Sequence, residues 1–358
     1  MVTPRKQAFE ELQLDHVELY LRDIDAPSRR LVERYGFEVY AVPDAGSAAA
    51  CRTAGVGREQ IRLLLTTSDH SAAGHLAERG EGVTGSDRTA AGDLAERNEG
   101  IAGLGLRVSD AAAAYAEAVR RGATPLSAPT EEQGVIVASI GGATGVTHTF
   151  VQRPPGADPR LLPGLVPTGA ASGGWDSGLV AVDHIGFWLE PDERAAAATF
   201  YQDILDFDLV FEAKLPVAGE VATSTVVQSR SGAVMVALHE LTASALPSAL
   251  EAASQVAFGT NDIVRTAAAL ASRGGDLLGV TPSFYREVGQ RLRPVRHRLD
   301  ELQAYGIAVD HDQDGQLFQL LTRPVPDVPH LYVEVIERIG AQTLGPSSLA
   351  ALYRTLYA

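Results

Sequence analysis

Alternating apolar and polar positions predict short strands through most of this 358-residue chain. One apolar run, residues 331–338, is rich in β-branched residues and carries Glu334 at its centre. Such a run predicts a strand that is buried on at least one face. A buried ionised carboxylate is costly unless it is protonated, paired or bound to a metal, so Glu334 is a candidate functional residue. The alternative interpretation is a residue on the polar side of an edge strand, next to an arginine.

The same order of predicted elements occurs twice, which indicates an internal duplication. A strand, a helix and a second strand are expected at residues 14–21, 26–34 and 35–39, and again at 182–189, 193–201 and 205–210. The first strands of the two copies carry His16 and His184, which are 168 residues apart.

A second pair of matching segments raises the number of copies to four. Strands are expected at 101–108 and 255–260, and each leads into a helix, at 110–121 and 263–273. Each helix is followed by a glycine suited to a helix end, Gly122 or Gly274. The remaining strands are predicted at 60–65, 134–140, 148–152, 224–228, 233–239, 306–310 and 317–322, and a C-terminal helix at 346–357. The pattern predicts an α+β protein of paired βαβββ modules.

Two domains follow from this arrangement. We expect an N-terminal domain at residues 1–155, a linker at 156–178 that is rich in proline and glycine, and a C-terminal domain at 179–358. The segment 72–82 returns nearly unchanged at 90–100, and we interpret this duplication as a surface insertion.

Composition narrows the class of protein. A content of 45% hydrophobic and 21% charged residues is typical of a soluble globular chain. A net charge of −15 argues against nucleic acid as a partner. The single cysteine, Cys51, excludes an internal disulfide and agrees with a reducing compartment. Residues 1–7 lack the apolar core of a signal peptide, and no apolar stretch is long enough to span a bilayer, so we expect a cytoplasmic protein without a membrane partner.

Paired βαβββ modules are the architecture of the vicinal oxygen chelate superfamily, and particular segments carry a closer likeness. The C-terminal half resembles the 4-hydroxyphenylpyruvate dioxygenase and 4-hydroxymandelate synthase family over nearly its whole length. The matching segments are 182–185, 224–229, 281–285, 315–319 and 332–338, while 140–142 and 148–153 in the N-terminal half resemble the synthase branch.

The resemblance implies a half-open barrel in the C-terminal domain that holds one Fe(II) ion between two histidines and a glutamate. Such a ligand set leaves coordination positions for a 2-oxo acid and for O2. His184 matches the first histidine and Glu334 the glutamate, whereas Gln255 stands where the second histidine is expected. By the same alignment Gly103 is the N-terminal counterpart of Gln255, so we expect no metal beside His16 and interpret that histidine as structural.

Three interpretations of Gln255 stay open at this point. Its amide oxygen can bind a divalent ion, as a glutamine does in glyoxalase I of the same superfamily. Alternatively, the metal is lost and the fold persists as a binding module, or a nearby histidine such as His239 replaces the missing ligand. For His239 the simpler interpretation is a strand-end histidine bonded to backbone or water.

The resemblance also implies which residues bind substrate. The matching positions are Ser224, His239, Gln319, Leu321, Tyr332, Ser348 and Leu349. Leu321 and Leu349 stand where phenylalanines clamp the substrate ring in the dioxygenase, and Ser348 stands where an asparagine is expected. Losing aromatic stacking, worth about 0.5–1.5 kcal/mol per pair, disfavours 4-hydroxyphenylpyruvate as the substrate.

The leading hypothesis is a non-heme Fe(II)-dependent oxygenase that decarboxylates and hydroxylates a 2-oxo acid of specialised metabolism, using O2. We expect it to act as a homodimer. The alternatives are a metal-free small-molecule-binding homologue and a divalent-metal isomerase or lyase of the same superfamily. The burial expected for Glu334 favours a metal, because without one the carboxylate needs another partner.

Overall fold

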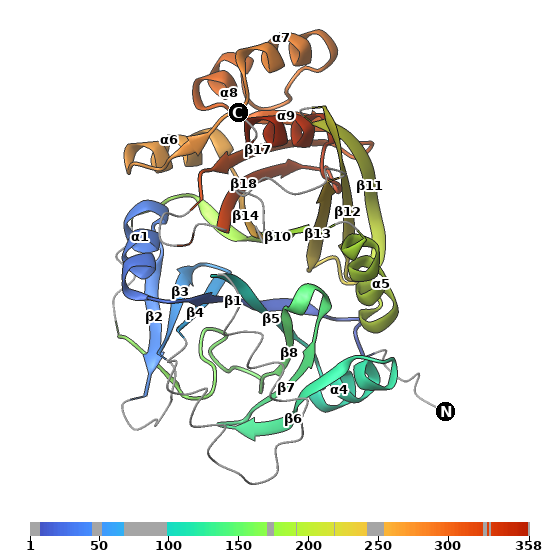
Figure 1. Cartoon of the computed structure of the whole chain (residues 1–358). Coiled ribbons are helices and arrows are strands. Elements are labelled where there is room, and N and C mark those ends of the chain that lie inside the picture. The colour runs from blue at the N-terminus through green and yellow to red at the C-terminus, as the bar shows by residue number, and fades with distance from the viewer. Residues whose placement is uncertain are drawn as a thin grey trace.

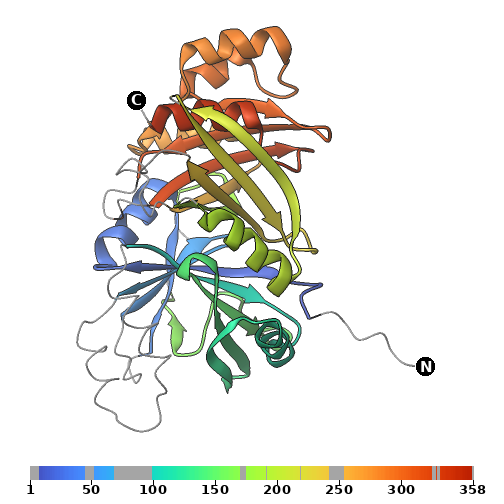
Figure 2. The ribbon, with the colours of Figure 1, turned by 45° about the vertical axis from the view of Figure 1, so that its right-hand side comes forward.

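Two curved β-sheets lie one above the other, each with helices along its outside (Figures 1 and 2). The structure is a computed structural model, and it describes residues 8–44, 52–67, 99–169, 175–190, 192–217, 219–241, 254–324, 328 and 331–356. The duplicated segments, 72–82 and 90–100, lie outside the described residues except for Glu99 and Gly100.

The first sheet belongs to the N-terminal half and has the strand order β6-β7-β8-β5-β1-β4-β3-β2-β9. Its elements are β1 Gln13–Leu21, α1 Asp25–Tyr35, β2 Glu38–Pro43, β3 Thr53–Arg58, β4 Ile61–Thr67, β5 Gly100–Arg107, α4 Ala111–Arg120, β6 Thr124–Glu132, β7 Val135–Gly141, the 3₁₀ turn Ala143–Gly145, β8 Thr147–Gln152 and β9 Leu165–Pro167.

The second sheet belongs to the C-terminal half and has the order β11-β12-β13-β10-β14-β18-β17-β15, with β16 also paired to β17. Its elements are β10 Leu179–Leu189, α5 Glu193–Leu205, β11 Asp208–Val217, β12 Glu220–Gln228, β13 Met235–Leu241, β14 Ser254–Thr260, α6 Ile263–Ser272, β15 Leu277–Leu278, α7 Pro282–Arg291, α8 Leu299–Tyr305, β16 Ala308–His311, β17 Gln316–Thr322, β18 Leu331–Ile339 and α9 Pro346–Leu356.

Strand pairing confirms the predicted α+β fold of paired βαβββ modules. In every module the first and last strands are parallel neighbours: β1 with β4, β5 with β8, β10 with β13 and β14 with β18. Two modules join into one sheet through the antiparallel pairs β1–β5 and β10–β14. The registers agree between halves, since Glu18 faces Gly103 as Gly186 faces Gln255. This is the vicinal oxygen chelate fold.

The repeated helices begin and end as their sequences predict. Asp110 caps α4 by accepting a hydrogen bond from the Ala113 N–H, and Asp262 caps α6 in the same way. Gly122 and Gly274 follow the two helices with φ of 108° and 74°. Those values favour glycine, which explains why both helices stop there.

Two features differ from the predicted pattern. Residues 165–167, within the predicted linker, form β9, which pairs with β2 and extends the first sheet. The fourth module is interrupted, because α7 and α8 lie between β15 and β16. Figure 1 shows these two helices projecting beyond the second sheet, away from the first.

The two halves share a continuous apolar core. The rings of Phe37 and Phe258 meet edge to face with centroids 5.4 Å apart. Polar contacts also cross, including a hydrogen bond of 3.1 Å between His148 Nε2 and the Tyr201 hydroxyl. A second apolar cluster fills the inside of the C-terminal sheet beneath α9. No helix in the described ranges is both long and apolar enough to cross a membrane.

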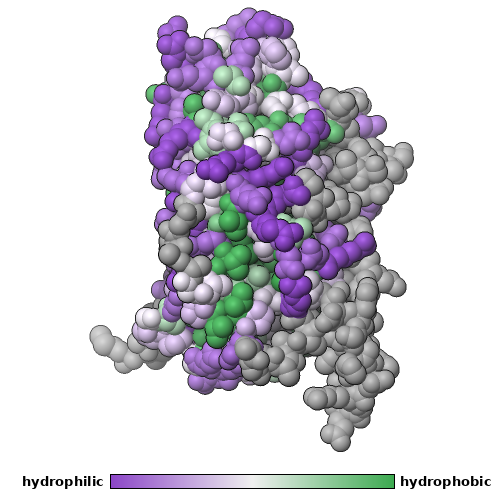
Figure 3. Space-filling model, turned by 90° about the vertical axis from the view of Figure 1, so that its left-hand side faces the viewer, coloured by the Kyte–Doolittle hydropathy of each residue, from purple (hydrophilic) through white to green (hydrophobic). Residues whose placement is uncertain are grey.

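The face that lies at the left of Figure 1 is mainly polar and carries an apolar band. Figure 3 turns this face to the viewer and shows hydrophobic residues gathered between hydrophilic ones. A groove of about 420 Å³ lies along α1 and the neighbouring strands, with an apolar lining that includes Ile24, Val32, Val39 and Val42. All its lining residues come from the N-terminal half, so it is separate from the strand that carries Glu334.

Candidate metal and substrate site

Three adjacent strands of the second sheet bring His184, Gln255 and Glu334 together. These residues lie on β10, β14 and β18, which are neighbours in that order. The His184 Nε2 atom is 3.4 Å from Glu334 Oε2 and 3.5 Å from Gln255 Nε2. The Gln255 amide also donates a hydrogen bond to Glu334 Oε2. All three side chains are buried, with 1%, 7% and 1% of their surfaces exposed.

The separation of His184 Nε2 and Glu334 Oε2 fits the first coordination shell of a divalent ion. Two ligand atoms that each lie about 2.1 Å from one ion, at 90–109° to each other, are roughly 3.0–3.4 Å apart. His184 Nε2 and Glu334 Oε2 meet that requirement. Gln255 does not meet it as it stands, because its amide is hydrogen bonded to Glu334 Oε2 and lies closer to that atom than two ligands of one ion do. To act as a ligand, its side chain has to move away from Glu334 as well as turn its amide oxygen toward the other two atoms. The donor types of the three residues fit a divalent ion, and His184 and Glu334 also have the spacing.

Asp183 and Arg338 fix the orientation of the His184 ring. The Asp183 carboxylate lies 2.9 Å from His184 Nδ1 and accepts two hydrogen bonds from Arg338, of 2.8 and 2.9 Å. This leaves Nε2 as the ring nitrogen directed at Glu334. Burial by itself lowers the pKa of His184, but the Asp183 and Glu334 carboxylates outweigh it and raise that pKa to about 9.

Glu334 has protein partners on both carboxylate oxygens. Gln319 Nε2 donates to Oε1 at 2.9 Å, while Gln255 donates to Oε2. Ser348 on α9 donates to the Gln319 oxygen and thereby fixes the Gln319 amide. The expectation that the burial of Glu334 favours a metal therefore loses support, because the Gln255 and Gln319 amides are partners of this carboxylate. The structure places Gln319 and Ser348 as supports of Glu334.

His239 belongs to a separate polar network beside these residues. Its Nδ1 atom lies 3.0 Å from both the Ser224 hydroxyl and the Tyr353 hydroxyl. Trp188 packs against the His239 ring with centroids 5.2 Å apart. The simple interpretation of His239 as bonded to backbone or water differs from the structure, in which its partners are buried side chains.

Three of the predicted substrate-binding residues are buried side chains of the sheet and α9. Leu321, Tyr332 and Leu349 are each at most 5% exposed. Tyr332 and Leu349 belong to the apolar cluster inside the C-terminal sheet, whereas Leu321 belongs to the larger core that both halves share. Tyr353 belongs to the same cluster as Leu349 and was not predicted from the sequence. Its spacing of four from Leu349 on a predicted helix could have indicated a shared face.

The N-terminal half has the same aspartate and arginine beside its histidine, but it lacks counterparts of Gln255 and Glu334. His16 Nδ1 lies 3.0 Å from Asp15, which accepts two hydrogen bonds of 2.8 Å from Arg153. The counterpart of Gln255 is Gly103, as expected, and the Glu18 carboxylate lies beside it. The sequence could have indicated this aspartate–arginine support, because in both halves an aspartate precedes the histidine and an arginine lies near the end of the last strand of the second module.

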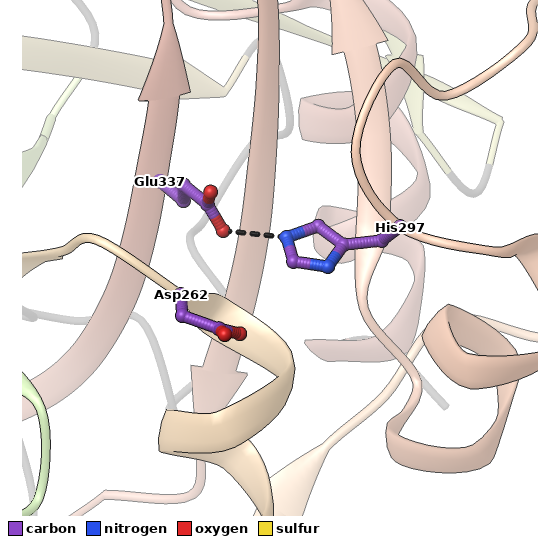
Figure 4. Close-up of side chains that lie close together, drawn as sticks. All are labelled: Asp262, His297 and Glu337. Carbon is purple, nitrogen blue, oxygen red and sulfur yellow. Dashed lines mark hydrogen bonds and ion pairs between the residues drawn. The ribbon is translucent and has the colours of Figure 1, made fainter.

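A second cluster of metal-ligating residue types lies at the start of α6 (Figure 4). There His297 Nε2 is 2.7 Å from Glu337 Oε2, and Asp262 lies nearby. That separation is a hydrogen bond and is too short for two ligands of one ion. Glu337 also accepts from the Ile263 N–H at 2.8 Å and from Arg296 at 2.9 Å. The cluster is therefore a hydrogen-bonded anchor between β18, α6 and the segment before α8.

Comparison with known proteins agrees with the fold. Residues 181–320 match the model of the Glyoxalase/Bleomycin resistance protein/Dioxygenase superfamily. A 4-hydroxyphenylpyruvate dioxygenase of Hordeum vulgare is 28% identical, covering 94% of this chain and 82% of that protein. One from Tetrahymena thermophila is 24% identical, covering 96% and 89%.

A solved structure has the same fold over nearly the whole chain. A mutant of 4-hydroxymandelate synthase from Streptomyces coelicolor superposes with a TM-score of 0.78 at 22% identity, covering 97% of this chain and 98% of that one. The agreement extends over both sheets. This chain therefore has the vicinal oxygen chelate fold, and over nearly its whole length it is similar to the 4-hydroxyphenylpyruvate dioxygenases and to 4-hydroxymandelate synthase.

Proposed function

We propose that this chain is a non-heme Fe(II)-dependent oxygenase that acts on a 2-oxo acid, with the ion held by His184, Gln255 and Glu334. The observation that supports this proposal is the convergence of three buried side chains from neighbouring strands, at separations of 3.4 and 3.5 Å from His184 Nε2. The homologues named 4-hydroxyphenylpyruvate dioxygenase support the same class of reaction.

Each of the three residues has a distinct task. His184 offers Nε2, because Asp183 holds Nδ1. Glu334 offers Oε2 and supplies negative charge, while Gln319 holds its other oxygen. Gln255 offers a neutral amide oxygen, which is a suitable donor for a hard or borderline divalent ion. When bound, Fe(II) supplies adjacent open positions at which a 2-oxo acid and O2 can meet.

The surrounding residues exclude water and shape the space for the organic substrate. Leu321 and Leu349 provide aliphatic walls, and Tyr332 and Trp188 add aromatic ones, all nearly without solvent exposure. Ser224, His239 and Tyr353 add neutral polar atoms on one side. This lining suits a compact substrate with one hydrogen-bonding group better than one whose ring needs two aromatic faces.

Metal content of matched variants tests the proposal. Protein loaded anaerobically with Fe(II) should retain close to one ion per chain after desalting, and Glu334→Gln should lose that ion. Glu337→Gln is the control, because Glu337 lies on the same strand but contacts His297 and Arg296 instead of His184. Equal iron retention by Glu334→Gln and the wild type would refute the assignment.

The contacts of Glu334 support a second candidate, a metal-free small-molecule-binding homologue. Gln255 and Gln319 already donate to the carboxylate, so the site is internally satisfied without an ion. The same experiment separates the two candidates. Wild-type protein that retains no Fe(II) but binds 2-oxo acids in calorimetry would favour the binding protein. The homodimer and the cytoplasmic location stay predictions.

A further inference from the structure

The second sheet ends in a long strand that has a neighbour on one side only within the described part of the chain. This strand, β11, has ten residues, is first in the order of its sheet and pairs with β12. Figure 1 shows it at the right-hand margin of the second sheet. An edge strand offers its outer backbone N–H and C=O groups to another strand. The structure therefore has a place where a further strand can be added.

The pairing with β12 determines which backbone groups lie on that outer edge. Val217 pairs with Glu220 across two intervening residues, and such a closing pair exchanges two hydrogen bonds. Hydrogen-bonded pairs alternate along an antiparallel ladder, so the odd-numbered residues back to 211 also bond to β12. The N–H and C=O groups of Glu212 and Lys214 then point away from β12, toward the free edge.

The two residues with outward backbone groups carry opposite charges. Lys214 is exposed, makes no ion pair with any described residue and is one of only two lysines in the chain. Glu212 shares Arg194 with Glu240, since Arg194 lies 3.4 Å from each carboxylate. One arginine between two carboxylates leaves a net negative charge beside β11. This edge therefore presents one uncompensated charge of each sign.

We propose that β11 is the interface between two copies of this chain, in which the two β11 strands pair antiparallel about a two-fold axis at Ala213. This axis places Glu212 of each copy opposite Lys214 of the other, and these are the residues whose backbone groups face outward. The same register thus forms four backbone hydrogen bonds and two ion pairs. An axis at Glu212 or at Lys214 would instead place two like charges opposite each other. The inference does not depend on the proposed metal site.

The other face of the paired strands is apolar. Phe211 and Ala213 pack at the margin of the apolar cluster beneath α9, and Leu215 belongs to that cluster. In the proposed register Phe211 of one copy lies opposite Leu215 of the other, on both sides of the two Ala213 side chains. Cross-strand pairs of aromatic and aliphatic residues stabilise a sheet. The interface would therefore extend the apolar cluster from one copy into the next.

Two features of β11 oppose open-ended strand addition but are compatible with this pair. Pro216 has no N–H, and a lysine on an edge strand discourages unspecific association. The two-fold pair leaves Pro216 outside the four hydrogen bonds and gives each Lys214 a carboxylate. It also closes, because each copy uses its one β11 edge. The expected assembly is a dimer and not a filament.

Sedimentation equilibrium of charge variants tests the proposal. Wild-type protein should form a dimer, and Lys214→Glu should weaken it about tenfold or more, because two attractive contacts become repulsive. Glu212→Lys should weaken it in the same way. A mixture of the two variants should form mixed dimers, in which both contacts again join opposite charges. A monomeric wild type, or a dimer that Lys214→Glu leaves unchanged, would overturn the proposal.

A cysteine at the proposed axis provides an independent test. Opposite residues that do not exchange hydrogen bonds have Cα atoms about 4.5 Å apart, which suits a disulfide. Ala213→Cys in a Cys51→Ser background should therefore cross-link two copies under mild oxidation. Lys214→Cys is the matched control, because the two cysteines would lie about 8 Å apart, beyond the reach of a disulfide.

The pattern of cross-linking decides whether the register is right. Circular dichroism, measured first, shows whether each variant is folded. Cross-linking of folded Ala213→Cys alone would support the axis at Ala213. Cross-linking of both variants, of neither, or of Lys214→Cys alone would overturn the proposal.

Discussion

Substitution of Asp183 should weaken metal binding, and the internal repeat supplies a matched control for this prediction. Asp183 contacts His184 and Arg338, and Asp15 contacts His16 and Arg153 with the same atoms at nearly the same distances. Only the C-terminal copy lies beside a proposed metal. Asp183→Asn and Asp15→Asn therefore remove the same charge from the same local structure, once at the site and once away from it.

The expected cost in stability follows from burial. Removing one partner of a buried ion pair leaves the other charge uncompensated and costs roughly 3–5 kcal/mol. The Asp15 and Arg153 side chains are 1% and 6% exposed, so Asp15→Asn should approach that range. The Asp183 and Arg338 side chains are 15% and 19% exposed, so solvent screens the loss and Asp183→Asn should cost less. Urea unfolding of the metal-free protein measures both values.

The two variants should rank in the opposite order for metal affinity, with the larger loss in Asp183→Asn. Loss of a carboxylate that orients a ligating histidine typically lowers metal affinity about 10–100-fold. Asp183→Asn should therefore weaken Fe(II) binding by that factor, as measured by competition with a chelator, while Asp15→Asn leaves it unchanged. Equal losses in both variants would show that the effect is global destabilisation. No loss in Asp183→Asn would refute the role of His184 as a ligand.

Three other predictions follow. Gln255→His should tighten Fe(II) binding in the same chelator competition, because imidazole is a stronger donor than an amide; unchanged affinity would place Gln255 outside the coordination shell. Oxygen consumption should be slower with 4-hydroxyphenylpyruvate than with at least one shorter 2-oxo acid, because Leu321 and Leu349 do not stack on a ring; the reverse ranking would contradict this. Burial lowers the pKa of His148 from 6.5 to about 4, partly offset by its bond to the Val146 carbonyl. Between pH 6.5 and pH 4, His148 binds a proton in the unfolded chain but not in the folded one. The free energy of unfolding is therefore unaffected by His148 above pH 6.5 and falls by roughly 3 kcal/mol as the pH is lowered to 4. Urea unfolding of His148→Gln should lose that part of the pH dependence, and an unchanged slope would contradict it.

The repeat made the fold predictable from the sequence. Matching histidines and helix-ending glycines aligned the four modules, and the aligned residues do share register positions, as Gly103 and Gln255 show. β9 was missed because three residues are too few for a pattern to appear. The interruption of the fourth module was missed because α7 and α8 are inserted between β15 and β16, where the other copies have one continuous strand.

The site was less predictable because its contacts join residues far apart in the chain. The resemblance implied substrate contacts for Gln319 and Ser348, but it did not indicate that Gln319 donates to Glu334 or that Ser348 donates to Gln319. Tyr353 comes from the last helix and reaches His239 on β13. Which atoms meet depends on how α9 packs on the sheet, and no spacing within one element contains that information.

The sequence left open whether Glu334 pairs with an arginine or binds a metal, and the two glutamates of β18 differ in this respect. Along a strand, residues three apart point to opposite faces. Glu337 points outward and has the arginine and histidine partners of an ordinary ion pair, with His297 at 2.7 Å. Glu334 points inward to neutral amides and to one histidine nitrogen at 3.4 Å. Amides can turn to present either a donor or an acceptor, whereas an arginine only donates. A buried carboxylate held by amides therefore stays satisfied without a metal, and it can still accept one when the Gln255 amide turns its oxygen inward. A fixed arginine at the same place would compete with a cation for the carboxylate, whereas the amides and the titratable His184 beside Glu334 are compatible with both states.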